Sequence, residues 1–261
     1  MSLGALTLTN KNSIRKKIAK RPWLYIMMLP GIIYFLIFKY IPMWGVLIAF
    51  KQYQPLLGLW GSKWVGFKHF YNFFSNPDFL MLFQNTFIMA LYNLVFYFPL
   101  PIILAIILNE VRHSAFKRVV QTVVYIPHFI SWVIVVGISY SLFTTEGGVV
   151  NEILSSLGLN KVNFLLSQQT FRPMIISQII WKETGWGTII FLAAIAGISP
   201  ELYESAEIDG ANRLQKIFNI TLPLITPTII ILLILRLGHF LDTGFEQIFL
   251  MMNPMNRKVA E

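Results

Sequence analysis

The sequence contains no cysteine among its 261 residues, and charged residues make up only 13% of it. The lack of cysteine excludes disulfides, thiolate metal sites and cysteine nucleophiles. A soluble domain of this size would carry roughly 25% charged residues. Because 56% of the residues are hydrophobic, the composition predicts a chain that is solvated by lipid rather than by water.

Motifs that mark catalytic or metal-binding proteins are also missing. The chain has no Gly-rich P-loop ending in Lys-Ser or Lys-Thr, no Gly-x-Ser-x-Gly elbow and no His-Glu-x-x-His pair. Its four histidines are scattered over separate loops and apolar segments, which argues against a metal site. We therefore expect no catalytic residue, no metal ligands and no cofactor bound by this chain.

Positive charge is present, and it is concentrated near the amino terminus. The formal net charge of +9 would fit a nucleic-acid-binding protein, but a basic run stands directly before the first apolar segment. Cytoplasmic positive charge beside a membrane span has this position. We therefore expect a lipid bilayer, and not nucleic acid, to be the partner of this charge. The run consists of Lys11, Arg15, Lys16, Lys17, Lys20 and Arg21.

Five apolar segments are long enough to cross a hydrocarbon layer of about 30 Å. Prolines inside them, such as Pro127 in the third, predict bends that neighbouring groups can accommodate. The predicted fold class is all-α, a polytopic membrane protein with a cytoplasmic basic tail at 1–22 and a transmembrane domain at 23–261. The five segments cover residues 23–50, 83–108, 119–143, 174–198 and 222–251.

The loop charges favour a cytoplasmic amino terminus, because more Lys and Arg then lie inside than outside. With this orientation the loop 199–221 is cytoplasmic and the loop 144–173 is outside. The outside loop has apolar residues at helical spacing over 149–157, followed by Gly158. This pattern predicts a short interfacial helix that ends at the glycine.

The most distinctive stretch is the polar segment 199–223, which joins the last two apolar segments. Ser199 and Pro200 favour the start of a helix, and Asp209-Gly210 favours a sharp turn because glycine accepts positive φ. We expect a short helix across the membrane surface, with residues small enough to enter a groove on another protein. The alternative is an ordinary solvated loop with incidental acidic residues.

Several ionisable side chains lie inside the predicted spans or near their ends. Each charge near the bilayer centre costs about 2.5–3.5 kcal/mol on insertion scales, so such residues usually face a bundle interior or a wet cavity. One interpretation is a polar translocation path that offers hydrogen bonds to sugar hydroxyls. The other is structural: Glu183 and Arg236 neutralise each other, while Asp242 and Glu246 lie at the outer boundary. The charged candidates are Lys182, Glu183, Arg236, Asp242 and Glu246.

Other path candidates are polar or aromatic. Trp181 and Trp186 could stack on the apolar faces of pyranose rings. His128 and Ser131 follow Pro127 in the third segment, although a single histidine is more often a packed, hydrogen-bonded residue than a ligand or relay. Gly185 and Gly187, together with nearby alanines, predict close helix contacts along the fourth segment, which we expect to be central and packed against a partner subunit.

The segment 204–223 resembles the EAA loop of binding-protein-dependent ABC importer permeases: Glu-Ala-Ala, three residues, Gly, nine residues, Ile, one residue, Leu-Pro. Only Ser205 departs from that pattern, where the family has Ala. The resemblance implies a coupling helix that docks into a cleft of an ATPase subunit. Its docking face would be Glu204, Ser205 and Ala206, its turn Asp209 and Gly210, and the entry to the next span Leu222 and Pro223.

Further stretches resemble the carbohydrate-uptake, maltose-type branch, and most of all its oligosaccharide and polysaccharide permeases. In that branch the fold is the transmembrane domain of a type I importer, and a sixth span normally follows the fifth. The resemblance covers roughly residue 22 to the end. The stretches are 64–67, 125–127, 181–187 and 244–254, with Asn85-Thr86 and Phe245-Glu246-Gln247.

The resemblance also implies the assembly. This chain would be one half of a pseudo-symmetric permease pair in a bacterial cell membrane, beside a second, homologous permease. Two ATPase subunits would bind ATP and Mg²⁺ below it, and an extracytoplasmic solute-binding protein would dock above. A permease for a non-sugar solute is the first alternative, and an ATP-independent secondary transporter or an intramembrane enzyme using Glu183 and Asp242 is the second.

Overall fold

The computed structural model describes residues 20–242 and 244–260, so most of the predicted basic tail lies outside the described residues. The chain divides into two units, Met1–Phe79 and Leu80–Glu261, which are described separately. Among the described residues, four helices are long and apolar enough to cross a membrane, or five if one bent pair counts as a single span. This agrees with the predicted all-α, polytopic fold.

The first unit is built from one long apolar helix and a small hairpin. The helix covers Pro22–Phe50 and consists of α2 (Pro22–Phe35), a π-helical turn (Leu36–Tyr40) and a tighter 3₁₀ segment (Ile41–Phe50). None of its residues is buried within the unit. The remaining elements are β1 (Lys51–Gln52) and α3 (Gly58–Gly61), then β2 (Lys63–Trp64), antiparallel to β1, and α4 (Lys68–Phe74).

An aromatic cluster holds the hairpin of the first unit together. The rings of Phe50 and Trp64 stack with centroids 5.6 Å apart, while Phe67 meets Phe50 edge to face and Phe70 meets it at a tilt of 39°. Aromatic pairs of this kind contribute about 0.5–1.5 kcal/mol beyond their buried area. The helix therefore ends in a compact cap rather than in a loose loop.

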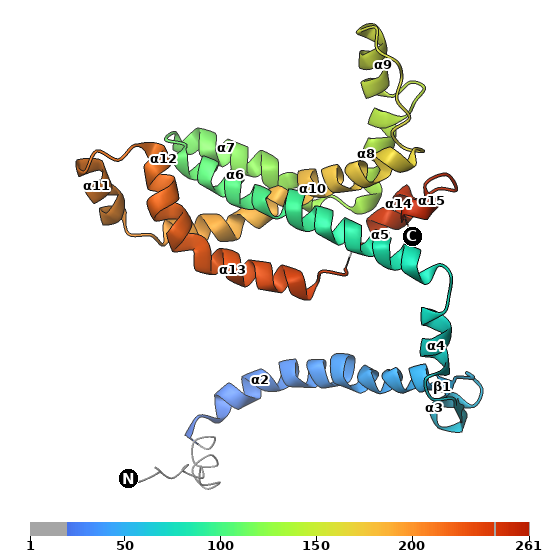
Figure 1. Cartoon of the computed structure of the whole chain (residues 1–261). Coiled ribbons are helices and arrows are strands. Elements are labelled where there is room, and N and C mark those ends of the chain that lie inside the picture. Colours follow the sequence, from blue (N-terminus) through green and yellow to red (C-terminus); the bar gives the residue numbers. More distant parts are fainter. Residues whose placement is uncertain (1–19, 243, 261) are drawn as a thin grey trace, which may run out of the picture. The chain divides into compact units, whose positions relative to one another are not determined.

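The second unit is a bundle around the 29-residue helix α10 (Gln168–Ala196). Figure 1 shows α6, α7 and α13 lying along α10, and these helices contact it. Its small residues explain the close approach: a Cβ at Gly185 would overlap the backbone carbonyl of Val124, and one at Gly187 would lie 3.0 Å from Pro101. The predicted close helix contacts at both glycines are therefore confirmed.

Before α10 the second unit contains a long helical run, a second helix that ends in a 3₁₀ turn, and two further helices, α8 and α9. A 32-residue run, Phe79–Glu110, is formed by α5 (Phe79–Tyr92), a π-turn (Asn93–Tyr97) and α6 (Pro99–Glu110). Next come α7 (Ser114–Tyr125) with a 3₁₀ turn (Ile126–Phe129), α8 (Trp132–Phe143) and α9 (Val149–Ser156). The predicted helix in the outside loop is thus confirmed as α9, and Gly158 follows it with φ +75°.

The helices after α10 contain the polar segment and the carboxyl end. They are α11 (Pro200–Ile208), α12 (Arg213–Lys216), a π-turn (Ile217–Thr221), α13 (Leu222–Gly238), α14 (Phe245–Met251) and α15 (Arg257–Ala260).

Two predicted spans are not continuous helices. The third breaks after Phe129, and its two halves, Ser114–Phe129 and Trp132–Phe143, meet at 103°. The predicted bend near Pro127 is confirmed. The predicted helix over 222–251 is wrong, because α13 ends at Gly238 and Gly244, with φ +77°, precedes a separate short helix.

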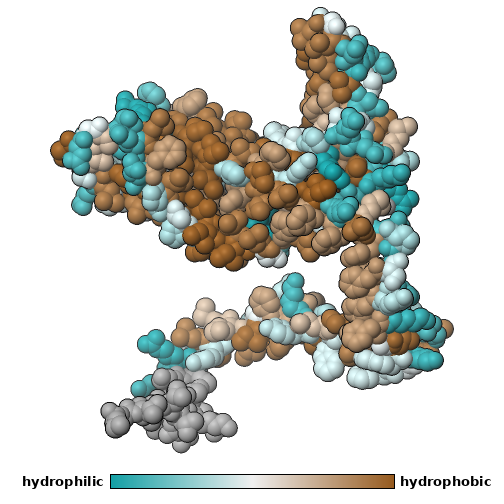
Figure 2. All heavy atoms as spheres, viewed as in Figure 1, coloured by the Kyte–Doolittle hydropathy of each residue, from teal (hydrophilic) through white to brown (hydrophobic). Residues whose placement is uncertain are grey.

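Two apolar cores stabilise the second unit. One surrounds Phe171, Ile175 and Met251, where α14 packs beside the first half of α10. The other joins Ala105, Phe191, Ile195 and Ile225 from α6, α10 and α13. In Figure 2 apolar residues cover most of the bundle, as expected of a surface that faces lipid or other membrane-embedded chains.

Candidate functional site

The first candidate region is the helix α11 and its following turn. Pro200 occupies the first turn of α11 and Ser199 its N-cap position, although the Ser199 side chain makes no capping hydrogen bond. The helix ends at Ile208, and Gly210 adopts φ +78°, which allows the Ala211 N–H to donate to the Ala206 carbonyl at 2.8 Å. The predicted short helix and its sharp turn are confirmed.

The predicted docking residues have different degrees of exposure. Glu204 and Ser205 are exposed, and the Ser205 hydroxyl donates to the Leu202 carbonyl at 3.2 Å. Ala206 is half-buried. Glu204 also lines a recess of about 400 Å³ beside Tyr203 and the end of α10. The exposed carboxylate forms no ion pair with any described residue, so it is available to a cation on another protein.

Specific polar contacts fasten α11 to the start of α13. The Tyr203 hydroxyl lies 2.9 Å from the Thr221 hydroxyl. Thr221 is only 2% exposed and directly precedes Leu222 and Pro223. Glu207 pairs with Lys216 at 2.5 Å, and this hydrogen bond lowers the pKa of the Glu207 carboxyl below its usual 4.5. A displacement of α11 would therefore be transmitted to α13 through short contacts.

Asn212 and Gln215 organise the turn between these two helices. The Asn212 side chain accepts the Gln215 N–H, and the Gln215 side chain accepts the Asn212 N–H, which is a complete capping box. This box starts α12 three residues after Gly210. The polar segment is thus ordered by local hydrogen bonds on both sides of the Gly210 turn.

The second candidate region lies where the broken third span meets α10. His128 Nδ1 lies 2.7 Å from Glu183 Oε2, and the imidazole stacks on the Trp186 indole with centroids 4.4 Å apart. Lys182, whose side chain is 7% exposed, donates to the His128 carbonyl at 2.5 Å and lies 3.4 Å from Glu183. Lys182 Nζ is also 5.4 Å from the Trp132 ring, on the other side of the break. We call His128, Trp132, Lys182, Glu183 and Trp186 the break cluster.

The break cluster corrects the predicted pairing of Glu183 with Arg236. Glu183 is occupied by His128 and Lys182, because the turn at Pro127 places the His128 ring and carbonyl against α10. Arg236 forms no ion pair with a described residue, and its guanidinium instead lies 5.6 Å from the ring centre of Tyr97. The expectation that a single histidine is a packed, hydrogen-bonded residue agrees with this arrangement.

Arg236 belongs to a separate cavity of about 370 Å³ between the run Phe79–Glu110, α10 and α13. Tyr97 and Gly187 line one side of it, and Asp242 and His239 lie in its wall just beyond α13. The structure therefore places most of the path candidates in two regions, the break cluster and this cavity.

Three path candidates lie outside both places. Trp181 is exposed and, together with Pro127 and Thr184, lines a mostly apolar cavity. Ser131 is the exposed N-cap residue of α8, and Glu246 is exposed in the first turn of α14.

The sequence prediction missed several residues of the second unit that contact polar or charged groups. Tyr97 stands in an aromatic run without any distinguishing pattern. Gln178 and Gln247 did carry a signal, because polar amides inside apolar segments need partners. The Gln247 side chain donates to Gln178 Oε1 at 2.8 Å, and Gln178 donates to the Ser139 hydroxyl at 2.7 Å.

Comparison with known proteins places this geometry in a family. The family model described as binding-protein-dependent transport system inner membrane component matches residues 97–260, which include the break cluster, the Arg236 cavity and the polar segment. The chain belongs to this family. It is a multi-pass permease subunit of an ABC transport system and not its catalytic subunit. This membership excludes the alternatives of a secondary transporter and an intramembrane enzyme.

The chain is similar to two Bacillus subtilis (strain 168) proteins over most of its length. It is 56% identical to Protein LplB over 92% of this chain and 75% of the relative. It is 54% identical to the polygalacturonan/rhamnogalacturonan transport system permease protein YteP over 94% of this chain and 76% of the relative.

Two solved structures of bacterial ABC transporters are also similar to this chain. A bacterial ABC transporter involved in the import of the acidic polysaccharide alginate matches with a TM-score of 0.86 and 47% identity, covering 95% of this chain and 83% of the other. An alginate ABC transporter in complex with an alginate pentasaccharide-bound periplasmic protein matches with a TM-score of 0.85, also at 47% identity.

Proposed function

We propose that this chain is a permease subunit of an ATP-driven importer for oligosaccharides or polysaccharide fragments in a bacterial cell membrane. Its amino terminus and polar segment would face the cytoplasm. The similarity to YteP and to the alginate transporters supports a carbohydrate substrate. A second, homologous permease, two ATPase subunits that hold ATP and Mg²⁺, and a solute-binding protein on the opposite face would complete the complex.

The single observation that carries the coupling part of this proposal is the geometry of α11. The helix presents the exposed Glu204 and Ser205 and the half-buried Ala206, while Tyr203 joins it to the residue that precedes α13. Glu204 is a partner for an arginine or lysine of the ATPase subunit, because a charge-assisted hydrogen bond is stronger than a neutral one. ATP binding would close the ATPases and move α11, and α13 would follow through Thr221.

Alternating access follows from this linkage. With the ATPases closed, the cavity between the two permeases opens toward the solute-binding protein and receives the sugar. Hydrolysis and product release return the cavity to the cytoplasmic side. The permease contributes positioning and transmission, and the partner subunits contribute the free energy of hydrolysis.

The test is the ATPase activity of the co-expressed complex in lipid, stimulated by sugar-loaded solute-binding protein. The variant combines Glu204→Ala with Gly210→Pro, and the matched control is Glu201→Ala, an acid in the first turn of the same helix. We expect the variant to assemble with its ATPases but to lose stimulation, while the control keeps it. Unchanged stimulation in the assembled variant would contradict the coupling role, and stimulation by non-sugar solutes alone would contradict the substrate class.

A further inference from the structure

Lys182 and Arg236, two cations of the second unit, are in opposite situations. Lys182 is nearly buried and fully engaged by the His128 carbonyl, Glu183 and the Trp132 ring. Arg236 is half-buried, and its guanidinium forms neither an ion pair nor a hydrogen bond with any described residue. Its position over the Tyr97 ring leaves the N–H groups at the edge of the guanidinium free.

An unpaired guanidinium beside a cavity inside an apolar bundle is costly, because a charge in a low-dielectric setting is stabilised by an anion or by water. The cavity volume of about 370 Å³ falls within the range of small-molecule sites. Tyr97, Phe98 and Phe191 supply aromatic walls for the apolar face of a sugar ring. The cavity therefore has the composition of a saccharide subsite with one cationic group.

The negative charge in the same wall does not cancel this cation. No oxygen of Asp242 lies within 4.0 Å of an Arg236 nitrogen, and Asp242 instead accepts the Gly244 N–H at 3.4 Å. Asp242 is exposed in the segment that follows α13. From that position it can accept hydrogen bonds from sugar hydroxyls while Arg236 binds an anionic group farther along the ring.

We propose that Arg236 selects anionic sugars by binding the carboxylate of a uronate residue in the cavity lined by Tyr97, Gly187 and Asp242. A guanidinium suits this role because its planar N–H groups bind a carboxylate through two parallel hydrogen bonds. The inference rests on the proposed function, since it assigns the substrate class of the same transport path. Lys182 is not part of this selection, because its charge is already used within the break cluster.

The test compares two forms of one sugar. Uptake of oligogalacturonate and of its methyl ester is measured in lipid vesicles that contain the whole complex and its solute-binding protein. Because the binding protein is the same throughout, its own preference cancels in the ratio of variant to wild type. The variants are Arg236→Gln and Arg236→Lys, and Arg118→Gln on the exposed face of α7 controls for the loss of one positive charge.

We expect Arg236→Gln to lower kcat/KM for the acid by about tenfold to a hundredfold, the range of a charge-assisted hydrogen bond, and to leave the ester nearly unchanged. Arg236→Lys should recover part of the acid uptake, and Arg118→Gln should match wild type. Equal losses for acid and ester would mean a structural role and overturn the inference, as would wild-type acid uptake by Arg236→Gln. If the wild-type complex imports neutral oligosaccharides but neither form of oligogalacturonate, the inference fails and the proposed function stands, whereas a complex that imports no saccharide contradicts the proposed function.

Discussion

At the scale of single residues, Gly185 shows how backbone contact fixes the bundle. The glycine lies inside α10, where the backbone of Val124 leaves no room for a Cβ atom. Removing a side chain here lets two helices approach to backbone contact, as small residues do in membrane helices. The cost of glycine in a helix, about 1 kcal/mol relative to alanine, is offset by this packing.

We therefore predict that Gly185→Ala lowers the thermal stability of the purified protein, because an added methyl group forces α7 and α10 apart. Overpacking of this kind costs about 1–3 kcal/mol. The matched control is Gly137→Ala in α8, where nothing lies within 4 Å of an added Cβ and the substitution should be neutral or stabilising. Thermal unfolding in detergent measures both variants, and equal melting temperatures would contradict the close contact.

The break cluster holds a buried cation beside a carboxylate. The ammonium of Lys182 is paired with Glu183, which also hydrogen-bonds to His128. Removing one member of a buried pair costs about 3–5 kcal/mol, and the 24% exposure of the Glu183 side chain reduces that figure. Because Lys182 and Glu183 form an ion pair, the stability losses of their single substitutions should not add.

We predict that a double-mutant cycle with Lys182→Met and Glu183→Gln will show this coupling. Each single change should lower the melting temperature, and the double variant should be less destabilised than the sum, with a coupling of about 0.5–3 kcal/mol. Arg236→Met paired with Glu183→Gln is the control, because these side chains do not pair. Additive effects in the first cycle, or coupling of similar size in the second, would favour the Glu183–Arg236 pair that the structure contradicts.

At the scale of elements, local patterns predicted what local chemistry decides. The α11 helix, its glycine turn and the α9 helix follow from cap residues, turn residues and apolar spacing over fewer than about ten positions. The end of α13 was not predicted, because hydropathy stays high through Leu241 and again from Phe245. The helix nevertheless ends at Gly238, and Gly244, with φ +77°, precedes the separate helix α14.

The partners of the buried polar groups could not be predicted for a different reason. Helical periodicity places Lys182 and Glu183 on α10, but it does not set how the broken third span is rotated against that helix. Only the turn at Pro127 brings the His128 ring and carbonyl to the two side chains. Tyr97 remained unnoticed because its role depends on the distant Arg236.

The Tyr203–Thr221 contact leads to a prediction about coupling. Tyr203→Phe removes one hydroxyl and leaves that of Thr221 buried without a partner, which costs about 1–3 kcal/mol. The double variant Tyr203→Phe with Thr221→Val removes both partners and should recover most of the stability. If the contact transmits the motion of α11, the double variant should still import less solute for each ATP hydrolysed.

The measurement is the ratio of solute imported to ATP hydrolysed in lipid vesicles, alongside thermal unfolding. The control is Tyr71→Phe in α4 of the first unit, which also removes one tyrosine hydroxyl. Tyr97→Phe would not serve, because Tyr97 lines the Arg236 cavity. A double variant that is stable and fully coupled would assign the contact to folding alone.

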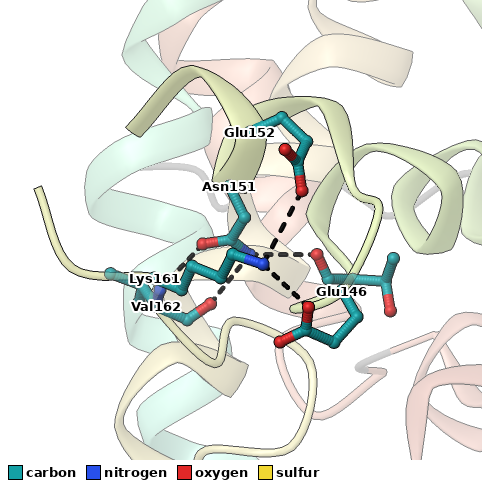
Figure 3. A network of polar contacts seen from close by, with 6 residues as sticks. Glu146, Asn151, Glu152, Lys161 and Val162 are labelled. Carbon is teal, nitrogen blue, oxygen red and sulfur yellow. Dashed lines mark hydrogen bonds and ion pairs between the residues drawn. The ribbon is translucent and has the colours of Figure 1, made fainter. Parts of the chain in front are cut away.

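At the scale of the whole chain, the side arm formed by α8, α9 and the segment up to residue 167 is the feature that the family comparison leaves unexplained. In Figure 1 it projects from the end of the bundle in the second unit. Figure 3 shows what holds its tip: the buried Asn151 side chain bonds to the Val162 N–H and carbonyl, and Lys161 pairs with Glu146 and Glu152. The hydrogen bond that Lys161 donates to Glu146 raises the pKa of the Lys161 ammonium above its usual range.

The burial of α9 is inverted relative to an ordinary surface helix. Its buried residue is the polar Asn151. Val149, Ile153 and Leu157, spaced four residues apart, are each more than half exposed to solvent. In Figure 2 apolar residues gather along one side of the projection and polar residues along the other. A short amphipathic helix of this kind lies in a membrane interface with its apolar face among the acyl chains.

We predict that Ile153 contacts lipid and that Ser155, about 200° around the helix, contacts water. The chain has no cysteine, so Ile153→Cys and Ser155→Cys each accept a single nitroxide label without any other change. In lipid vesicles the label at 153 should be more accessible to oxygen and less accessible to a water-soluble nickel complex than the label at 155. Equal accessibility would contradict interfacial burial. A label at 153 shielded from both reagents would show that a protein partner, and not lipid, covers this face, because a folded neighbour excludes oxygen as well as nickel.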